Sequence, residues 1–316
     1  MNCLCCGKPL RSPVLPSGWH LSCIQRFFGT QELPELELDD STLRLLAEKS
    51  VQKGYTIPGV QKKLSLHLSH EKQARLTLVD YPTGYILKPQ VQEFPAMPEA
   101  EHLIMLMADR SGLSVVPHAL IRLSGEYAYI TKRIDRDAVL SSRVQMLAME
   151  DFCQLSLRLT QDKYKGSYEQ CVRVIRRYSS RPGLDISELF LRLVFCFLTG
   201  NSDMHLKNFS LIEAAAGSGE YILSPAYDLL PVNVLMPEDQ EEFALQINGK
   251  KSNLRRSHFL AFADYAGISQ HSAEAMIRAM LNRIPMWLKL CKESLLPDNL
   301  KQPLISLICE RSSRLS

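Results

Sequence analysis

The sequence predicts an α+β protein of two lobes, in which a strand-rich lobe precedes a helix-rich lobe. Three observations predict this class. Short apolar or alternating runs bounded by turn residues fill residues 55–135. From about residue 145 onward, apolar residues recur at the spacing of helices. The chain has 316 residues, roughly twice a typical domain. Runs of strands followed by runs of helices are typical of α+β folds.

Composition and charge exclude several classes of protein. Lys and Arg number 37 against 34 Asp and Glu, so the net charge is only +3. This balance excludes a supercharged nucleic-acid coat and a disordered acidic tail. The start of the chain lacks the apolar core of a signal peptide, and the apolar stretch 190–198 is short and broken by Arg192. We therefore expect a cytoplasmic protein with no membrane contact and no direct nucleic-acid binding. The nine Cys, an odd number, argue against a fully paired disulfide framework.

The chain divides into four segments. Residues 1–30 form a cysteine-rich head. Residues 31–54 are expected to form a linker and a leading helix, because acidic residues surround a proline at their start. Residues 55–135 form the first lobe and residues 136–316 the second.

The first lobe is expected to contain strands, one helix and a hairpin. The helix starts near Pro98, whose fixed φ suits a first turn, and stops before Gly112. The turn at residues 124–125 separates the two strands of the hairpin. The predicted strands span residues 64–68, 76–79, 85–88, 115–123 and 127–132.

The second lobe is expected to be helical around one short hairpin. Two apolar runs, 208–212 and 221–223, flank a Gly/Ser patch and predict the hairpin. The predicted helices span residues 149–160, 168–179, 186–199, 257–266, 270–283 and 301–311.

The most informative chemistry lies in the segment 200–210. Asp203 and Asn208 have four residues between them, which is the spacing of the catalytic loop of protein kinases. In that loop the Asp orients or accepts the proton of the substrate hydroxyl, and the Asn oxygen holds a magnesium ion on the phosphates. Asp228 follows the predicted hairpin, where a kinase places its second magnesium ligand.

A kinase also needs a strand lysine, an acidic partner and a loop over the phosphates. Lys88 ends an apolar strand, and Glu101 on the next helix can hold its ammonium group. The segment 54–63 precedes a strand, and its backbone near Gly59 can approach the β- and γ-phosphates. Each signal is weak alone, since Asp228 also suits a helix cap and Lys88 a solvated strand end. Their order along the chain favours a phosphotransferase.

Several of these segments resemble the HipA-like serine/threonine kinases. The run G-N-S-D-M-H-L-K-N-F-S is similar to their signature G-x-x-D-x-H-x-K-N-F-S. The resemblance extends, in order, from about residue 55 to at least residue 235. Its other segments read G-V-Q-K-K-L-S-L, Y-I-L-K-P, E-H-L-I-M-L-M-A-D-R-S-G-L, K-R-I-D-R, E-D-F-C-Q and P-A-Y-D-L-L.

The resemblance implies a two-lobed kinase fold, distantly related to the phosphatidylinositol 3/4-kinases, that uses ATP and Mg²⁺. It implies that Asp203 is the catalytic base and that Asn208 and Asp228 are the magnesium ligands. It also implies that Lys88, held by Glu101, contacts the ATP phosphates. The other implied residues are Gly59, Gln61 and Lys63 of the phosphate loop, Asp135 beside the ribose, and His205 and Lys207 of the catalytic loop.

Some of these roles have alternatives. His205 also suits a structural role, in which it orients the loop through a backbone carbonyl. Lys207 is then the better candidate for neutralising the charge of the transferring group. Asp135 also suits an ion pair with Arg133 or Arg136.

The resemblance further implies the toxin of a toxin–antitoxin system that phosphorylates an aminoacyl-tRNA synthetase beside a HipB-like DNA-binding antitoxin. Full-length HipA proteins carry an extra N-terminal subdomain, whereas only the short head precedes the match here, as in the shortened HipT kinases. We therefore expect a small HipS-like partner to supply that subdomain. The loop of the family often carries autophosphorylated serines before its glycine, where this chain has Thr56 and Pro58. Of these two residues only Thr56 has a hydroxyl group, so autophosphorylation is expected at Thr56.

The head carries a pattern typical of a zinc site. Cys3-x2-Cys6 is followed, after thirteen residues, by His20-x2-Cys23, and two such tight pairs can close around one tetrahedral ion. Cys5 offers an alternative ligand. A metal would replace the hydrophobic core that so small a segment lacks. A metal-free packed head and a head that contacts nucleic acid are the alternatives. The aromatic residues expected to pack the head onto the first lobe are Trp19, Phe27 and Phe28.

Three functions are therefore open. A Mg-ATP-dependent protein kinase that acts as a growth-inhibiting toxin is favoured by the complete set of implied catalytic and magnesium residues. A catalytically silent HipA-like scaffold that acts through a repressor partner is the second. It is favoured by the phosphate loop, in which Pro58 stands where the family often has a serine. A zinc-dependent nucleic-acid protein fits the head alone.

Overall fold

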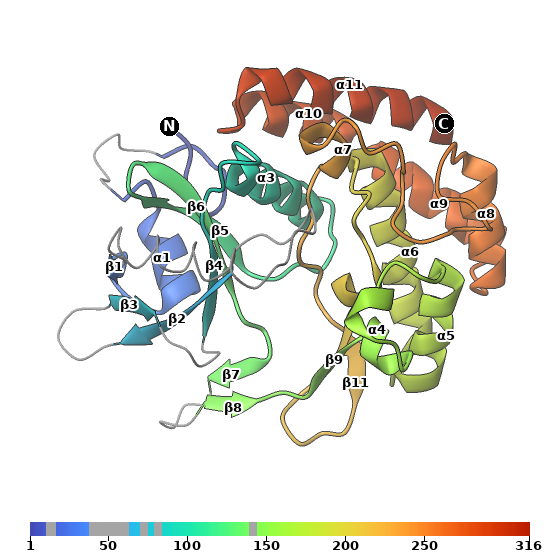
Figure 1. The fold of residues 1–316 in the computed structure, drawn as a ribbon, viewed down its shortest axis with the longest axis horizontal. Coiled ribbons are helices and arrows are strands. Elements are labelled where there is room, and N and C mark those ends of the chain that lie inside the picture. Colours follow the sequence, from blue (N-terminus) through green and yellow to red (C-terminus); the bar gives the residue numbers. More distant parts are fainter. Residues whose placement is uncertain (11–16, 38–62, 70–74, 79–83, 139–143) are drawn as a thin grey trace. The chain divides into compact units, whose positions relative to one another are not determined.

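The computed structural model describes the chain except for residues 11–16, 38–62, 70–74, 79–83 and 139–143. The described residues form two compact units (Figure 1). The first unit contains Met1–His102 and Val116–Ile134, and the second contains Leu103–Val115 and Asp135–Ser316. Residues 103–115 are thus part of the second unit, although the sequence analysis assigned them to the first lobe.

A six-stranded sheet forms the centre of the first unit, with the strands in the order β1-β3-β2-β4-β6-β5. The β1–β3 pair is parallel, and the other neighbours are antiparallel. In the β5–β6 hairpin, Ser124 and Gly125 both have positive φ, as in the turns that match the twist of a hairpin. The strands are β1 (Glu35–Glu37), β2 (Leu64–Ser69), β3 (Arg75–Leu78), β4 (Tyr85–Lys88), β5 (His118–Leu123) and β6 (Glu126–Lys132).

Strand β1 lies within residues 31–54, which the sequence analysis expected to form a linker and a leading helix. Its three residues pair with β3, forty residues further along the chain, from Glu35 opposite Arg75 to Glu37 opposite Thr77. The acidic composition of the segment reflects its exposed side chains. It could not reveal that the segment pairs with β3, which is so distant in sequence. The structure therefore places a short strand at the start of the segment expected to form a linker and a leading helix.

The head packs on the sheet through aromatic rings. Helix α1 (Leu21–Phe28) buries Phe27 and Phe28, whose ring centroids lie 5.8 and 5.3 Å from that of Tyr85 in β4. Trp19 is fully buried and lies within 5.6 Å of both phenylalanine rings. The Tyr85 hydroxyl donates a hydrogen bond to the carbonyl of Phe27 at 3.2 Å. The expected packing of the head through these aromatic residues is confirmed.

Helices dominate the second unit, and α6 (Pro182–Thr199) is its central element (Figure 1). It packs against α5, α9 and α11, and both of its faces are buried along most of its length. Pro182 starts it and Gly200 ends it. Within the described residues, every helix is too short or too polar to cross a bilayer. The other helices are α3 (Met97–Arg110), whose start belongs to the first unit, and α4 (Phe152–Leu155), α5 (Tyr168–Tyr178), α7 (Val232–Leu235), α8 (Arg256–Tyr265), α9 (Gln270–Leu281), α10 (Ile284–Glu293) and α11 (Asp298–Leu315).

Two small sheets accompany these helices. Strands β9 (Met149–Asp151), β10 (Ser210–Glu213) and β11 (Tyr221–Leu223) form one in the order β11-β10-β9. Strands β7 (Arg136–Ala138) and β8 (Val144–Met146) form the other. The antiparallel β10–β11 pair confirms the hairpin predicted in this part of the chain. The sequence analysis did not predict β7, β8, α7 or α10.

The helix expected over residues 149–160 is wrong. The first three residues pair with β10 as strand β9, and α4 covers only the next four. Asp151 caps α4 by accepting a hydrogen bond from the Gln154 N–H group. Leu157, with a φ of 55°, then leaves helical geometry. Apolar spacing alone could not reveal a strand whose partner lies so far along the chain.

We expect Tyr85→Phe to lower the free energy of unfolding by about 1 kcal/mol, because it removes a buried hydrogen bond and leaves the Phe27 carbonyl unsatisfied. Urea unfolding measures this change. Tyr178→Phe is the control, since Tyr178 is exposed on a different unit and should lose little. Equal stability of both variants would contradict the docking of the head on β4.

Candidate functional site

The end of α6 sets the course of the predicted catalytic loop. Gly200 has a φ of 77°, and its N–H group donates to the carbonyls at the end of the helix. A Cβ atom at this position would lie 3.2 Å from the side chain of Leu307 on α11. Both the left-handed backbone and the close neighbour therefore favour glycine where the chain leaves the helix.

Hydrogen bonds within the loop join the two residues with kinase spacing. The Asp203 carbonyl accepts from the Asn208 Nδ2 group and from the His205 N–H group, both at 2.8 Å. The Asn201 side chain accepts from the Asp203 N–H group at 3.2 Å. Asp203 and Asn208 are therefore held in one rigid turn, which includes the 3₁₀ turn Leu206–Asn208.

The carboxylate of Asp203 is half-buried and accepts a hydrogen bond from a neutral donor. The Tyr164 hydroxyl donates to Asp203 Oδ1 at 2.7 Å. Burial raises the pKa of Asp203 above its ordinary value, although the Tyr164 hydrogen bond and the charge of Lys163 act in the opposite direction. The negative charge of Asp228 raises it further. A carboxylate whose pKa is raised above its ordinary value suits a general base.

Asp228 lies close enough to Asp203 to affect its ionisation, and it has a φ of 55°. Such a φ is uncommon for a residue other than glycine and costs conformational energy. The neighbouring Tyr227 hydroxyl donates to the Lys207 carbonyl at 3.1 Å and shares a hydrogen bond with Ser210 at 2.7 Å. The alternative of a helix cap is wrong for Asp228, because α7 begins four residues later, after Pro231.

Lys207 is held by an acidic residue that the sequence analysis did not single out. Its Nζ atom lies 2.5 Å from Asp151 Oδ2, and Asp151 also caps α4. The signal for this pairing was present in the segment E-D-F-C-Q, but it required knowledge that β9 lies beside β10. Lys207 is therefore paired with a carboxylate in this structure.

His205 and Tyr164 form a second structural link. The His205 ring is buried, and its centroid lies 5.0 Å from that of Tyr164 in an edge-to-face arrangement. This contact suits a residue that positions the loop. Tyr164 carried no motif, so only the structure identifies it as part of the site. The suggested bond from His205 to a backbone carbonyl stays a prediction.

The first unit contains the predicted lysine–glutamate pair. Lys88 Nζ lies 2.5 Å from Glu101 Oε1, and the two side chains are 3% and 0% exposed. The ammonium group also lies 5.2 Å from the centre of the Tyr129 ring, where a cation is favoured. The expected pairing is confirmed, and the alternative of a solvated strand end is wrong for Lys88.

A pair of buried histidines lies behind Tyr129. The His118 ring stacks on Tyr129 with centroids 6.0 Å apart, and His118 Nδ1 lies 3.0 Å from Nδ1 of His102 on α3. Such a contact requires that one nitrogen donate and the other accept, so at least one of the two rings is neutral. Burial lowers the pKa of both rings, that of His118 to about 3.

Only two of the other residues predicted to contact the nucleotide, Lys63 and Asp135, lie in the described part of the chain. Asp135 pairs with Arg136 at 2.7 Å, one of the two alternatives considered for it. Lys63 is described and exposed, immediately before β2. Gly59, Gln61 and the expected phosphosite Thr56 lie outside the described residues.

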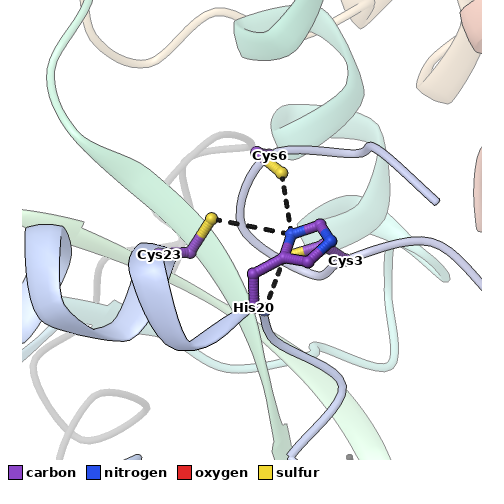
Figure 2. A group of neighbouring side chains, drawn as sticks. All are labelled: Cys3, Cys6, His20 and Cys23. Atoms are coloured by element: carbon purple, nitrogen blue, oxygen red, sulfur yellow. Dashed lines mark hydrogen bonds between the residues drawn. The ribbon is translucent and has the colours of Figure 1, made fainter. Parts of the chain in front are cut away.

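Four side chains of the head gather at one point, as Figure 2 shows. One ligand atom from each of Cys3, Cys6, His20 and Cys23 can be chosen so that all four lie within 4.8 Å of one another. His20 Nδ1 lies 3.4 Å from Cys6 Sγ and 3.9 Å from Cys23 Sγ. Cys5 is buried and is not one of these four residues, although its thiol is hydrogen-bonded to Cys23, and burial raises the pKa of the Cys5 thiol to about 11. These dimensions suit a group that could hold a metal ion.

Comparison with known proteins identifies the family of this fold. The sequence pattern of the family described as HipA-like C-terminal domain matches residues 55–288. "Putative kinase Y4mE" of Sinorhizobium fredii is 31% identical over 220 residues, which cover 67% of this chain and 51% of the relative. A "Putative kinase" of Haemophilus influenzae is 27% identical over 241 residues, covering 72% and 67%. The chain thus spans about half the length of the first of these relatives.

Two solved structures share the fold. HipA in the Shewanella oneidensis complex of HipA, HipB and operator DNA superposes with a TM-score of 0.67 at 19% identity, covering 85% of this chain and 70% of that one. The Helicobacter pylori proinflammatory kinase CtkA gives a TM-score of 0.55 at 14% identity, covering 80% and 93%. The predicted α+β kinase-like fold is therefore confirmed.

We expect acid to destabilise the protein through the histidine pair. The pKa of His118 is about 3 in the folded protein and about 6.5 in the unfolded chain. Between these two pH values only the unfolded chain takes up the proton, so the free energy of unfolding is highest above pH 6.5 and falls progressively as the pH drops toward 3. Below pH 6.5 the loss approaches about 1.4 kcal/mol per pH unit for each such histidine.

Urea unfolding at pH 7.5 and pH 5.5 measures this loss. His118→Gln should show a difference between the two pH values that is smaller than that of the wild type by about 1 kcal/mol. His271→Gln is the matched control, since His271 is exposed on α9 and should retain the wild-type difference. If His118→Gln also retains it, His118 is not neutral in the folded state.

Proposed function

Because the chain belongs to the HipA-like family, we propose that it is a protein kinase that transfers the γ-phosphoryl group of ATP to a serine or threonine hydroxyl. The observation that carries the proposal is the rigid turn that joins Asp203 to Asn208, with the Asp203 carboxylate bonded to Tyr164. Kinase catalysis depends on such positioning more than on covalent chemistry by the protein.

The residues of the loop fit a magnesium ion. Mg²⁺ prefers oxygen ligands. The Nδ2 group of Asn208 is bonded to the Asp203 carbonyl, so Oδ1 is the atom that this side chain offers to a cation. Asp228 and Asp203 oppose each other's ionisation, a cost that a divalent cation would offset. We assign Asn208 and Asp228 as the magnesium ligands.

The other roles follow from the charges of the side chains. When bound, ATP would supply the phosphoryl group, and its magnesium ion would offset the negative charge on the phosphates. Asp203 accepts the proton of the attacking hydroxyl. Lys207, oriented by Asp151, offers a positive charge for the transferring group.

In the first unit, Lys88 is assigned to the ATP phosphates and Glu101 to holding its ammonium group in place. The residues assigned to the nucleotide on sequence grounds are Gly59, Gln61, Lys63 and Asp135.

A catalytically silent scaffold is the competing function. Burying an ion pair costs desolvation free energy, and replacing such a pair with apolar residues is often neutral or stabilising. A chain without phosphotransfer has no need for Lys88 and Glu101 to be buried together. The buried pair therefore favours an active kinase.

For the biological role we propose a cytoplasmic toxin of a HipBA- or HipBST-like toxin–antitoxin system. The fold shared with the Shewanella HipA, which was solved with HipB and operator DNA, supports a HipB-like antitoxin as partner. The sequence resemblance supports an aminoacyl-tRNA synthetase as substrate, Thr56 as autophosphorylation site, and a small HipS-like partner.

We expect Asp203→Asn to lower phosphotransfer by about 10²- to 10⁴-fold, because the amide cannot accept the hydroxyl proton. Transfer of labelled phosphate from Mg-ATP to protein serine and threonine measures the loss. Asp264→Asn is the control, since Asp264 is exposed at the end of α8. Induced expression then separates the two functions, because equal growth arrest by wild type and Asp203→Asn would contradict a kinase toxin.

We expect Tyr164→Phe to shift the acid limb of the pH–rate profile to higher pH. The Tyr164 hydroxyl stabilises the ionised form of Asp203, so its removal raises the pKa of that carboxyl, and the base form is lost at higher pH. Values of kcat/KM between pH 5 and pH 9 measure the shift. An unchanged acid limb would mean that a group other than Asp203 limits the reaction.

A further inference from the structure

The first two cysteines of the cluster lie on a turn built to direct both sulfur atoms to one side. Residues 3–8 close on themselves, since the Gly7 N–H group donates to the Cys3 carbonyl at 2.9 Å and the Cys3 N–H group to the Lys8 carbonyl at 2.8 Å. Gly7, directly after Cys6, has a φ of 65°. This left-handed residue turns the chain back, and glycine adopts it without strain.

The second pair lies at the start of α1. His20 precedes the helix, and Cys23 lies in its first turn, with the Cys23 N–H group donating to the His20 carbonyl at 2.9 Å. The two side chains therefore lie on the same side of the helix end. Figure 2 shows the sulfur atoms of the three cysteines around the imidazole ring.

The hydrogen bond on the far side of the ring fixes which nitrogen faces the sulfur atoms as a ligand. His20 Nε2 lies 3.1 Å from the carbonyl oxygen of Pro9, which can only accept, so Nε2 carries the proton. The lone pair of the neutral ring is then on Nδ1, the atom nearest Cys6 and Cys23. A carbonyl that orients a histidine in this way is typical of metal sites.

From this arrangement we infer that Cys3, Cys6, His20 and Cys23 bind one structural Zn²⁺ ion. With sulfur about 2.3 Å from zinc, the edges of a tetrahedron are about 3.8 Å long. The cluster, with 3.4 and 3.9 Å from Nδ1 to two sulfur atoms, is already near this size. Four protein ligands leave no position for a substrate, so the ion has a structural role.

The site lies where it can control how the head is attached to the sheet. Leu4, inside the first ligand pair, accepts a hydrogen bond from the Leu120 N–H group at 2.8 Å. Trp19, directly before the second pair, donates from Nε1 to the Leu120 carbonyl at 3.1 Å. Both polar backbone atoms of one residue on the edge strand β5 are thus held by residues next to zinc ligands. We infer that the ion clamps the head to this edge.

The same clamp extends to the strand of Lys88. Phe27 and Phe28 follow Cys23 on α1 and pack on Tyr85, three residues before Lys88 in β4. Loss of the ion should therefore loosen β5 first, and β4 through Tyr85.

Metal content is the direct test. The full chain, purified without a histidine tag, should contain about one equivalent of zinc when measured by inductively coupled plasma mass spectrometry. The zinc content of Cys6→Ser should fall below about 0.2 equivalents. Cys309→Ser, an exposed cysteine on α11, and Cys5→Ser should both keep the metal. Wild type with less than about 0.2 equivalents, or with iron in place of zinc, overturns the proposal. Loss of zinc in Cys5→Ser with retention in Cys6→Ser overturns the ligand set.

Hydrogen exchange tests the clamp and does not depend on kinase activity. After a strong chelator removes zinc from the wild type, the Leu120 amide should exchange at least about tenfold faster, because its acceptor on Leu4 is released. The amide of Leu193 in α6, in the second unit, should keep its rate. An unchanged rate for Leu120 would mean that the head packs without help from the metal. Because this measurement uses the wild type, a failure of Cys6→Ser to fold does not affect it.

Discussion

The first unit depends on burying the charge of Lys88. An ammonium group that is 3% exposed must have a partner, and Glu101 provides it only if β4 and α3 keep a fixed spacing. The surrounding groups keep that spacing. Tyr129 offers its ring face to the ammonium group, and His118 stacks on that ring and contacts His102 of the same helix as Glu101. One ion pair thus requires a helix, three strands and a pair of neutral histidines to fit together.

In the second unit the corresponding constraint is on the backbone. Two backbone features hold Asp203 in place. Its main-chain carbonyl accepts a hydrogen bond from the Asn208 side chain, and α6 ends abruptly at Gly200, three residues earlier. Side chains from elsewhere then complete the loop, with Asp151 holding Lys207 and Tyr164 holding Asp203. A loop whose side chains are held by hydrogen bonds in this way suits catalysis by positioning.

The sequence predicted those parts of the site whose partners are close along the chain. Asp203 and Asn208 share one loop, and Lys88 and Glu101 lie on successive elements, so their spacing alone was informative. Asp151 is 56 residues from Lys207, and Tyr164 is 39 residues from Asp203. Such pairs depend on tertiary contacts such as the β9–β10 pairing, and the same pairing turned an expected helix into a strand. The sequence could not choose between Cys5 and Cys6 either, because only the folded turn of residues 3–8 shows that the Cys6 sulfur lies 3.4 Å from His20 Nδ1.

The place of the head on the sheet follows from the same need to satisfy polar groups. An edge strand such as β5 exposes N–H and C=O groups that invite pairing with another chain. The head covers Leu120 with one carbonyl and one indole N–H group, so the contact satisfies the strand without continuing the sheet. So few residues cannot bury a core of their own, and Trp19, Phe27 and Phe28 share that of the sheet. The first ten residues add only Leu4 and the thiols of Cys3 and Cys5 to the buried apolar side chains, so this core holds their path at few points. The cluster of sulfur atoms and imidazole lies where that path meets α1, which is where a cross-link would restrict the chain most.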